Sequence, residues 1–154
     1  MPSHNTELEV ERVVARALGE CKPGQAVWLG PGIPERLVGR VPVREEPATA
    51  QLALVEVGEV SPNGVAVVAS VPQPPCPVVG LSATPVEKLD ALLRPHDHVG
   101  VALTKLICPF AVFEFDKAGP VVREVRRGLT AADLQTRLAF ALWAGPDLKE
   151  LDAS

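Results

Sequence analysis

The sequence contains no tyrosine, two tryptophans and four phenylalanines, so it is poor in the aromatic side chains on which nucleic-acid bases stack. It also lacks a basic excess, because 15 Lys and Arg residues are outnumbered by 19 Asp and Glu, for a net charge of -4. A protein with this charge balance has no overall attraction for a polyanion. We therefore expect no nucleic-acid partner.

The sequence also lacks an apolar run of the roughly 18–20 residues that a membrane span requires. Its polar first residues, 1–5, do not have the pattern of a signal peptide. The cysteines are few and widely spaced, at Cys21, Cys76 and Cys108, which favours reduced thiols over a disulfide framework. We expect a cytoplasmic protein with no membrane partner.

The 154 residues fit one domain, 1–154, and leave no room for two of full size. Apolar residues make up 47% of the chain, which excludes extended disorder, and a core of this size needs no metal or disulfide. Sixteen prolines and twelve glycines follow no period and separate short elements.

Hydrophobic periodicity and turn residues predict alternating helices and strands. Helices are expected from capping boxes at Thr6 and Thr84, from Pro34 to Val38, and from Thr130 through Leu142. Strands are expected at 26–29, 51–57, 65–69, 98–103, 110–115 and 121–125. Residues 41–50 are interpreted as a connection and 71–78 as irregular or an edge. This alternation predicts an α/β domain of three layers with a mixed sheet.

One loop is a candidate ligand site. The strand expected at 26–29 runs into Gly30, Pro31, Gly32, Ile33 and Pro34, which feed the next helix. This arrangement places backbone amides at the carboxyl edge of a sheet, where they can bind an anion. Glycines allow a ligand to approach the backbone closely. A purely structural turn is the alternative.

Three blocks of sequence, 12–34, 53–64 and 110–134, resemble the second (beta) subunit of the family I CoA transferases. The first block contains a helix, a Lys-x-Gly turn, a strand and a Gly-x-Gly-Ile-Pro loop in the family's order. The second resembles a strand that ends in an acidic turn with glycine. The third combines a strand like Leu-Ala-Val-Phe with a helix start like Gly-Val-Thr-x-x-Glu-Val.

The resemblance implies a three-layer α/β/α fold with a mostly parallel sheet, of the type shared with sugar-phosphate isomerases. It also implies that the loop at 30–34 forms part of an acyl-CoA site. In such enzymes a glutamate in a Glu-Asn-Gly motif attacks the acyl-CoA. Coenzyme A or acyl-CoA is then the expected ligand, with no tightly bound cofactor. An alpha-type subunit or self-association is the expected assembly.

The sequence departs from the family at the nucleophile, because it contains no Glu-Asn-Gly. Its one Asn-Gly, Asn63-Gly64, follows a proline in a predicted turn. We interpret the short stretch after Pro34 as a deletion of the catalytic segment, with Glu45 and Glu46 as the carboxylates closest to the lost position. Two functions stay open: a beta-subunit-like transferase domain that has lost its catalyst, and a non-catalytic CoA-binding, anion-binding or assembly protein.

Other motifs are more simply explained as structure. The His-Asp-His run at 96–98, with Cys76 and Cys108, offers zinc ligands but lacks the paired spacing of a closed site, so no metal is expected. No cysteine–histidine motif supports a reactive thiol. A basic run could meet a CoA phosphate or form a solvated strand end, and it consists of Arg123, Arg126 and Arg127.

Overall fold

The computed structural model describes residues 2–67, 73–95, 100–116 and 119–151. The helical elements are α1 (Pro2–Leu18), η1 (Ile33–Leu37), η2 (Pro47–Thr49), η3 (Val86–Lys88), α2 (Leu89–Leu92) and α3 (Ala131–Gln135), where η marks a 3-10 helix. The strands are β1 (Val27–Leu29), β2 (Val43–Arg44), β3 (Leu52–Glu56), β4 (Val65–Ala66), β5 (Val78–Leu81), β6 (Val101–Ala102), β7 (Lys105–Ile107), β8 (Ala111–Asp116), β9 (Gly119–Val125) and β10 (Trp143–Glu150).

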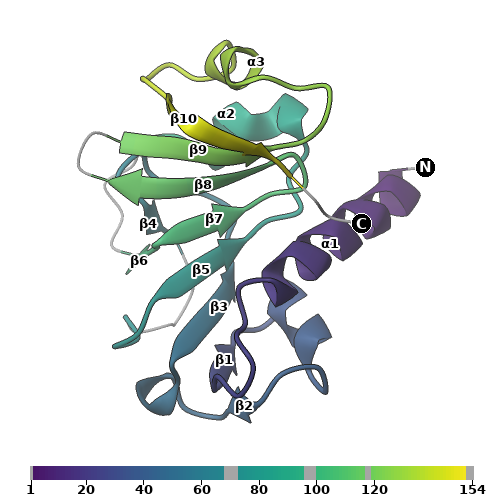
Figure 1. Ribbon diagram of the computed structural model, residues 1–154, viewed down its shortest axis with the longest axis vertical. Coiled ribbons are helices and arrows are strands. Elements are labelled where there is room, and N and C mark those ends of the chain that lie inside the picture. The colour runs from purple at the N-terminus through teal and green to yellow at the C-terminus, as the bar shows by residue number, and fades with distance from the viewer. Residues whose placement is uncertain (1, 68–72, 96–99, 117–118, 152–154) are drawn as a thin grey trace.

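An eight-stranded sheet forms the centre, in the order β10-β9-β8-β7-β5-β3-β1-β2 (Figure 1). Neighbouring strands from β2 to β7 are parallel, β8 is antiparallel to both β7 and β9, and β10 is parallel to β9. This confirms the prediction of a mixed, mostly parallel sheet.

Two hydrophobic clusters cover the two faces of this sheet. Leu52 and Leu54 of β3 point to a cluster that contains α1 and η1, whereas Ala53 and Val55 point to one that contains α2 and α3. In Figure 1, α1 lies on the near side of the sheet and α2 on the far side. Because both faces are covered, the central strands are apolar at successive positions rather than alternating. The three-layer α/β/α prediction is confirmed.

The first helix buries the predicted face, with Val10, Val13, Val14 and Ala17 all buried. It begins earlier than predicted, because α1 starts at Pro2 and Thr6 lies within it. The capping box expected at Thr6 is therefore wrong as the start of the helix.

The sequence patterns do not predict β2, β5, β7 or β10. β2 lies within the expected connection at 41–50 and pairs with β1. β5 follows a proline-dense stretch that was interpreted as irregular or an edge, yet it is fully buried between β3 and β7. The strand begins directly after Pro77, whose carbonyl still accepts a bond of 3.0 Å from the Ala53 amide. Proline thus ends the irregular segment without excluding a central strand.

The remaining helices are shorter than predicted. The helix expected from Pro34 is the 3-10 helix η1. Thr84 does not cap its helix, because its hydroxyl accepts a hydrogen bond from Ser82 and Pro85 occupies the N-cap. Thr130 does cap α3, accepting from the Asp133 amide at 3.1 Å.

The predicted continuation of the last helix to Leu142 is wrong, because α3 ends at Gln135 and β10 follows. The Gln135 side chain donates to the Phe140 carbonyl at 2.8 Å and accepts from the Leu142 amide at 2.7 Å. These two bonds hold the chain in a loop, so the apolar residues after α3 do not extend it.

The Asn63-Gly64 turn forms, with the Gly64 amide donating to the Ser61 carbonyl at 2.9 Å. The strand after it, β4, pairs with β6 outside the main sheet. The predicted hairpin of β8 and β9 is also present. Parts of the strands expected at 65–69 and 98–103, and part of the hairpin turn, lie outside the described residues. Within the described ranges, no helix has the length and apolar character needed to cross a membrane.

Ion pairs fix the end of α1 to the sheet. Arg16 donates from Nε to Glu124 Oε1 of β9 at 2.9 Å and from a terminal nitrogen to Glu20 at 2.7 Å. Lys105 at the start of β7 donates to Glu20 at 3.0 Å. The hydrogen bond to Glu124 raises the pKa of Arg16 most strongly. Burial opposes the charge of Glu20, but the hydrogen bonds from Arg16 and Lys105 together lower its pKa.

Replacing Arg16 should therefore destabilise the protein. We expect R16A to reduce the free energy of unfolding by about 1–3 kcal/mol, because two partly buried carboxylates lose charged donors. R12A is the matched control on the same helix, since the ion pair of Arg12 with Glu9, at 3.4 Å, is exposed. That control should cost about 0–1 kcal/mol. If urea unfolding shows the same decrease in the free energy of unfolding for R16A and R12A, the ion pairs of Arg16 do not stabilise the fold more than an exposed pair does.

Glu20 should make stability sensitive to acid. A carboxyl whose pKa is lowered in the folded state contributes stability above its ordinary value of 4.5, and that stability is lost as the pH falls through the lowered pKa. We expect thermal unfolding from pH 6 to pH 3 to show a smaller decrease in Tm for E20Q than for the unchanged protein. Parallel curves for the two proteins would contradict this.

Candidate functional site

The glycine loop follows β1 at the carboxyl edge of the sheet. Its first amide, that of Gly30, donates to the Leu54 carbonyl of β3 at 2.9 Å. Gly32 has φ 93° and ψ -132°, a conformation open to glycine and strained for other residues. The chain then enters η1, where Ile33 and Pro34 are buried. The loop is thus tied to β3 on one side and to the core on the other.

Glu56, the last residue of β3, lies against this loop. Its Oε1 accepts a hydrogen bond from the Ile33 amide at 2.9 Å. A Cβ placed on Gly32 would stand 2.6 Å from Glu56 Oε1, which is closer than real contacts allow. Glycine is favoured at position 32 by its backbone conformation, whereas the end of the flexible Glu56 side chain could move away from a new Cβ. The Glu56 side chain is nevertheless exposed, so a ligand can reach it.

Each N–H of the loop already has an acceptor within the chain. Gly30 donates to Leu54, Ile33 donates to Glu56, and Gly32 donates to Glu35 Oε1 at 2.6 Å. The two prolines of the loop have no N–H to offer. We expected unbonded amides in this loop that could bind an anion, and the structure differs. The amides of Gly32 and Ile33 instead donate to the carboxylates of Glu35 and Glu56, and Glu56 lies exposed at the edge of the sheet.

A search for Glu-Asn-Gly does not find Glu56, so the sequence analysis did not identify it as a site residue. The residues present are Glu56, Val57 and Gly58, and Val57 is buried while Gly58 is exposed. The signal that could have found Glu56 is its place at the end of the strand that pairs with β1. Two adjacent parallel strands end at the same edge, so the residues at their ends meet there.

The structure does not bring Glu45 or Glu46 to the loop in the same way. Both follow β2, the edge strand, and both have exposed side chains. Thr49 donates to the Glu46 carbonyl. Among the described residues, no hydrogen bond joins the loop at 30–34 to the carboxylate of Glu45 or Glu46. Glu56 thus has the better geometry for chemistry at residues 30–34.

The other candidates from the sequence have structural partners or lie elsewhere. Arg123 donates to Glu114 at 3.2 Å and Arg126 lies 4.0 Å from Glu9 of α1, so these two members of the basic run are engaged away from the loop, while Arg127 is exposed. Burial raises the pKa of the Cys108 thiol, which disfavours a reactive thiolate. Residues 96–98 lie outside the described residues. Within the described part, no three residues of the kinds that bind metal are grouped together.

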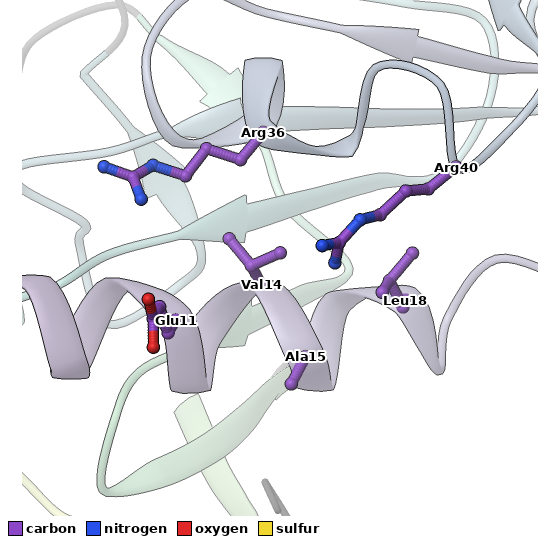
Figure 2. A pocket seen from close by; sticks show the side chains of 6 residues that line it. All are labelled: Glu11, Val14, Ala15, Leu18, Arg36 and Arg40. Atoms are coloured by element: carbon purple, nitrogen blue, oxygen red, sulfur yellow. The ribbon is translucent and has the colours of Figure 1, made fainter.

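A cavity of about 580 Å³ lies between α1 and the segment that follows the loop (Figure 2). Its apolar floor comes from α1, and the guanidinium groups of Arg36 and Arg40 extend over it. The residues that line it are Glu11, Val14, Ala15, Leu18, Arg36 and Arg40. None of these belongs to the glycine loop or to β3.

Solved structures with the same fold are known. The chain superposes on the acyl-CoA transferase YdiF of Escherichia coli O157:H7 with a TM-score of 0.76 and 15% identity, covering 94% of this chain and 43% of that one. YdiF has also been crystallised as a thioester complex with CoA, which matches with a TM-score of 0.69. The chain thus spans less than half of the length of YdiF.

Two further structures match over most of both chains. The decarboxylase AibA/AibB has a TM-score of 0.65 and 13% identity, with 94% of this chain and 89% of that chain covered. Glutaconate coenzyme A-transferase of Acidaminococcus fermentans has a TM-score of 0.62 and 12% identity, with coverage of 97% and 89%. No protein-family model matches the chain, and no curated protein matches it in sequence. At these identities the likeness establishes the fold.

The close approach of Gly32 and Glu56 can be measured by a double-mutant cycle. We expect G32A to reduce the free energy of unfolding more than G39A, because both glycines have positive φ but only Gly32 faces a neighbour within 4 Å. Removing the carboxylate with E56A should relieve a small part of the G32A loss, about 0.5 kcal/mol, because the end of the exposed Glu56 side chain can move away from the new Cβ. Additive effects in the double variant would contradict the contact.

Proposed function

We propose that this chain is a CoA-transferase domain of the beta-subunit type in which Glu56 is the nucleophile. One observation carries the proposal: the Glu56 carboxylate is exposed at the carboxyl edge and is held by the Ile33 amide at 2.9 Å. The fold shared with YdiF and glutaconate coenzyme A-transferase supports it. The domain is then catalytic rather than degenerate, and Glu56-Val57-Gly58 takes the place of Glu-Asn-Gly.

The geometry supports different roles for the two carboxylate oxygens. Oε1 is bound by the Ile33 amide, so Oε2 is the oxygen that attacks the thioester carbonyl. That attack forms a C–O bond, and the C–S bond breaks as CoA leaves as a thiolate. The product is a mixed anhydride between the acyl group and Glu56. Attack of the thiolate on the Glu56 carbonyl carbon then releases the acyl carboxylate and leaves a glutamyl-CoA thioester.

The transfer is completed by reversal with a second acid. The carboxylate of the acceptor attacks the glutamyl-CoA carbonyl, CoA leaves as a thiolate, and the thiolate then attacks the acceptor's acyl carbon in the new anhydride. Acceptor acyl-CoA forms and Glu56 is regenerated as a carboxylate, so no net proton, water or oxidant is consumed. Coenzyme A and acyl-CoA are thus substrates, and no bound cofactor is required.

We further propose an assembly and a location. The chain spans 43% of YdiF, which supports the idea that a second domain, an alpha-type subunit or another copy of this chain, completes the acyl site. The three cysteines are free, which supports a reducing compartment such as the cytoplasm.

Trapping the covalent intermediate tests the proposed nucleophile. After addition of acetyl-CoA and other short acyl-CoA thioesters, with and without a candidate alpha-type subunit, mass spectrometry of the digested protein should find CoA or acyl mass on the peptide that contains Glu56. E56A and E56Q should lose the adduct. The matched controls E45A and E46A, which remove carboxylates of the same edge, should retain it.

Two results would overturn the proposal. One is an adduct on Glu45 or Glu46 instead of Glu56. The other is the lack of any adduct, with every partner and thioester tried, while calorimetry shows that the same samples bind CoA. That second result would favour the non-catalytic CoA-binding protein.

A further inference from the structure

We propose that Glu35 is a positioning residue for Glu56, a role that rests on the proposed function of Glu56 as nucleophile. Two consecutive amides of the loop carry the connection. The Gly32 amide donates to Glu35 Oε1 at 2.6 Å, and the Ile33 amide donates to Glu56 Oε1 at 2.9 Å. The two carboxylates therefore hold neighbouring peptide groups of the same loop.

Glu35 controls the part of the loop that has most freedom. Gly32 precedes η1 but has no side chain that could cap it, and no side-chain cap is formed there. The Glu35 carboxylate reaches back from η1 and fixes the Gly32 amide instead. Glycine can adopt many backbone conformations, so its φ of 93° and ψ of -132° need such a restraint.

The orientation of the Ile33 amide depends on that restraint together with a backbone bond. The Ile33 N–H lies in the planar peptide group that joins Gly32 to Ile33, and the Gly32 carbonyl of this group accepts from the Glu35 amide at 3.0 Å. The Glu35 side chain holds the peptide group on the other side of Gly32, so losing it frees rotation at Gly32 that can turn the Ile33 N–H away from Glu56. The Glu56 side chain is long and exposed, and the Ile33 amide donates to its carboxylate. Once that bond is lost, the carboxylate can sample several rotamers, and a nucleophile displaced by about 1 Å loses on the order of 100-fold in rate.

A geometric role can be separated from an electrostatic one by two substitutions. Glu35→Gln keeps an oxygen that can accept from the Gly32 amide but removes the negative charge. Glu35→Ala removes both. If Glu35 acts by position, the Gln variant resembles the unchanged protein and the Ala variant does not. If Glu35 acts through its charge, the two variants behave alike.

Amide NMR provides a readout that does not depend on activity. In the unchanged protein, the hydrogen bond to Glu56 should protect the Ile33 amide from hydrogen exchange, and E56A should remove this protection. E35A should also increase hydrogen exchange at Ile33, by about tenfold or more, whereas E35Q and the control E46A should retain the protection. Tm values of all variants, measured in parallel, verify that each is folded.

The activity arm uses the adduct on Glu56. E35A should slow adduct formation by about 10- to 100-fold at saturating acyl-CoA, with E35Q within a few-fold of the unchanged protein. Unchanged hydrogen exchange at Ile33 in E35A would overturn the proposal, and so would equal changes in E35A and E35Q. If no adduct forms in any protein, the function of Glu56 fails, but the NMR result still decides whether Glu35 orients it.

Discussion

The parallel pairing of β1 with β3 determines the arrangement of the whole candidate site. Leu29 lies opposite Leu54, and the Gly30 amide continues the ladder to the Leu54 carbonyl. The two strands therefore end at the same level, and the residues after β1 meet the last residue of β3. Without this register, Ile33 and Glu56 would have no reason to touch, and η1 would begin in another direction.

Much of the fold could be predicted from the sequence because its signals are local. The buried face of α1 shows helical spacing, and the β8–β9 hairpin has a glycine-containing turn between two apolar runs. β2, β5 and β7 were missed for a different reason. They are two to four residues long and are stabilised by neighbouring strands and by the layers that cover the sheet. Such strands depend on tertiary contacts, which local propensity does not record.

The candidate site was predictable only in part. Glycine and proline mark the loop at 30–34 because a close approach and a rigid turn need those residues. Glu56 has no such local mark, since a carboxylate at the end of a strand resembles any solvated charge. Its importance comes from strand order, which brings it to Gly32, and the same order keeps Glu45 and Glu46 on the edge strand. The strand order therefore identifies Glu56 as a site residue, whereas a search for the Glu-Asn-Gly motif does not.

The anchoring of α1 has a consequence for how the chain folds as it is made. The helix is synthesised before the sheet, but the Arg16 partner Glu124 lies on β9, 108 residues later. Its apolar face packs against residues from strands as late as β7 and β8. The helix can therefore pack first against η1, β1 and β3, but its apolar face is fully covered only after β7 and β8 have been synthesised. Until those strands are made, part of this apolar face is open to a chaperone that binds exposed apolar helices.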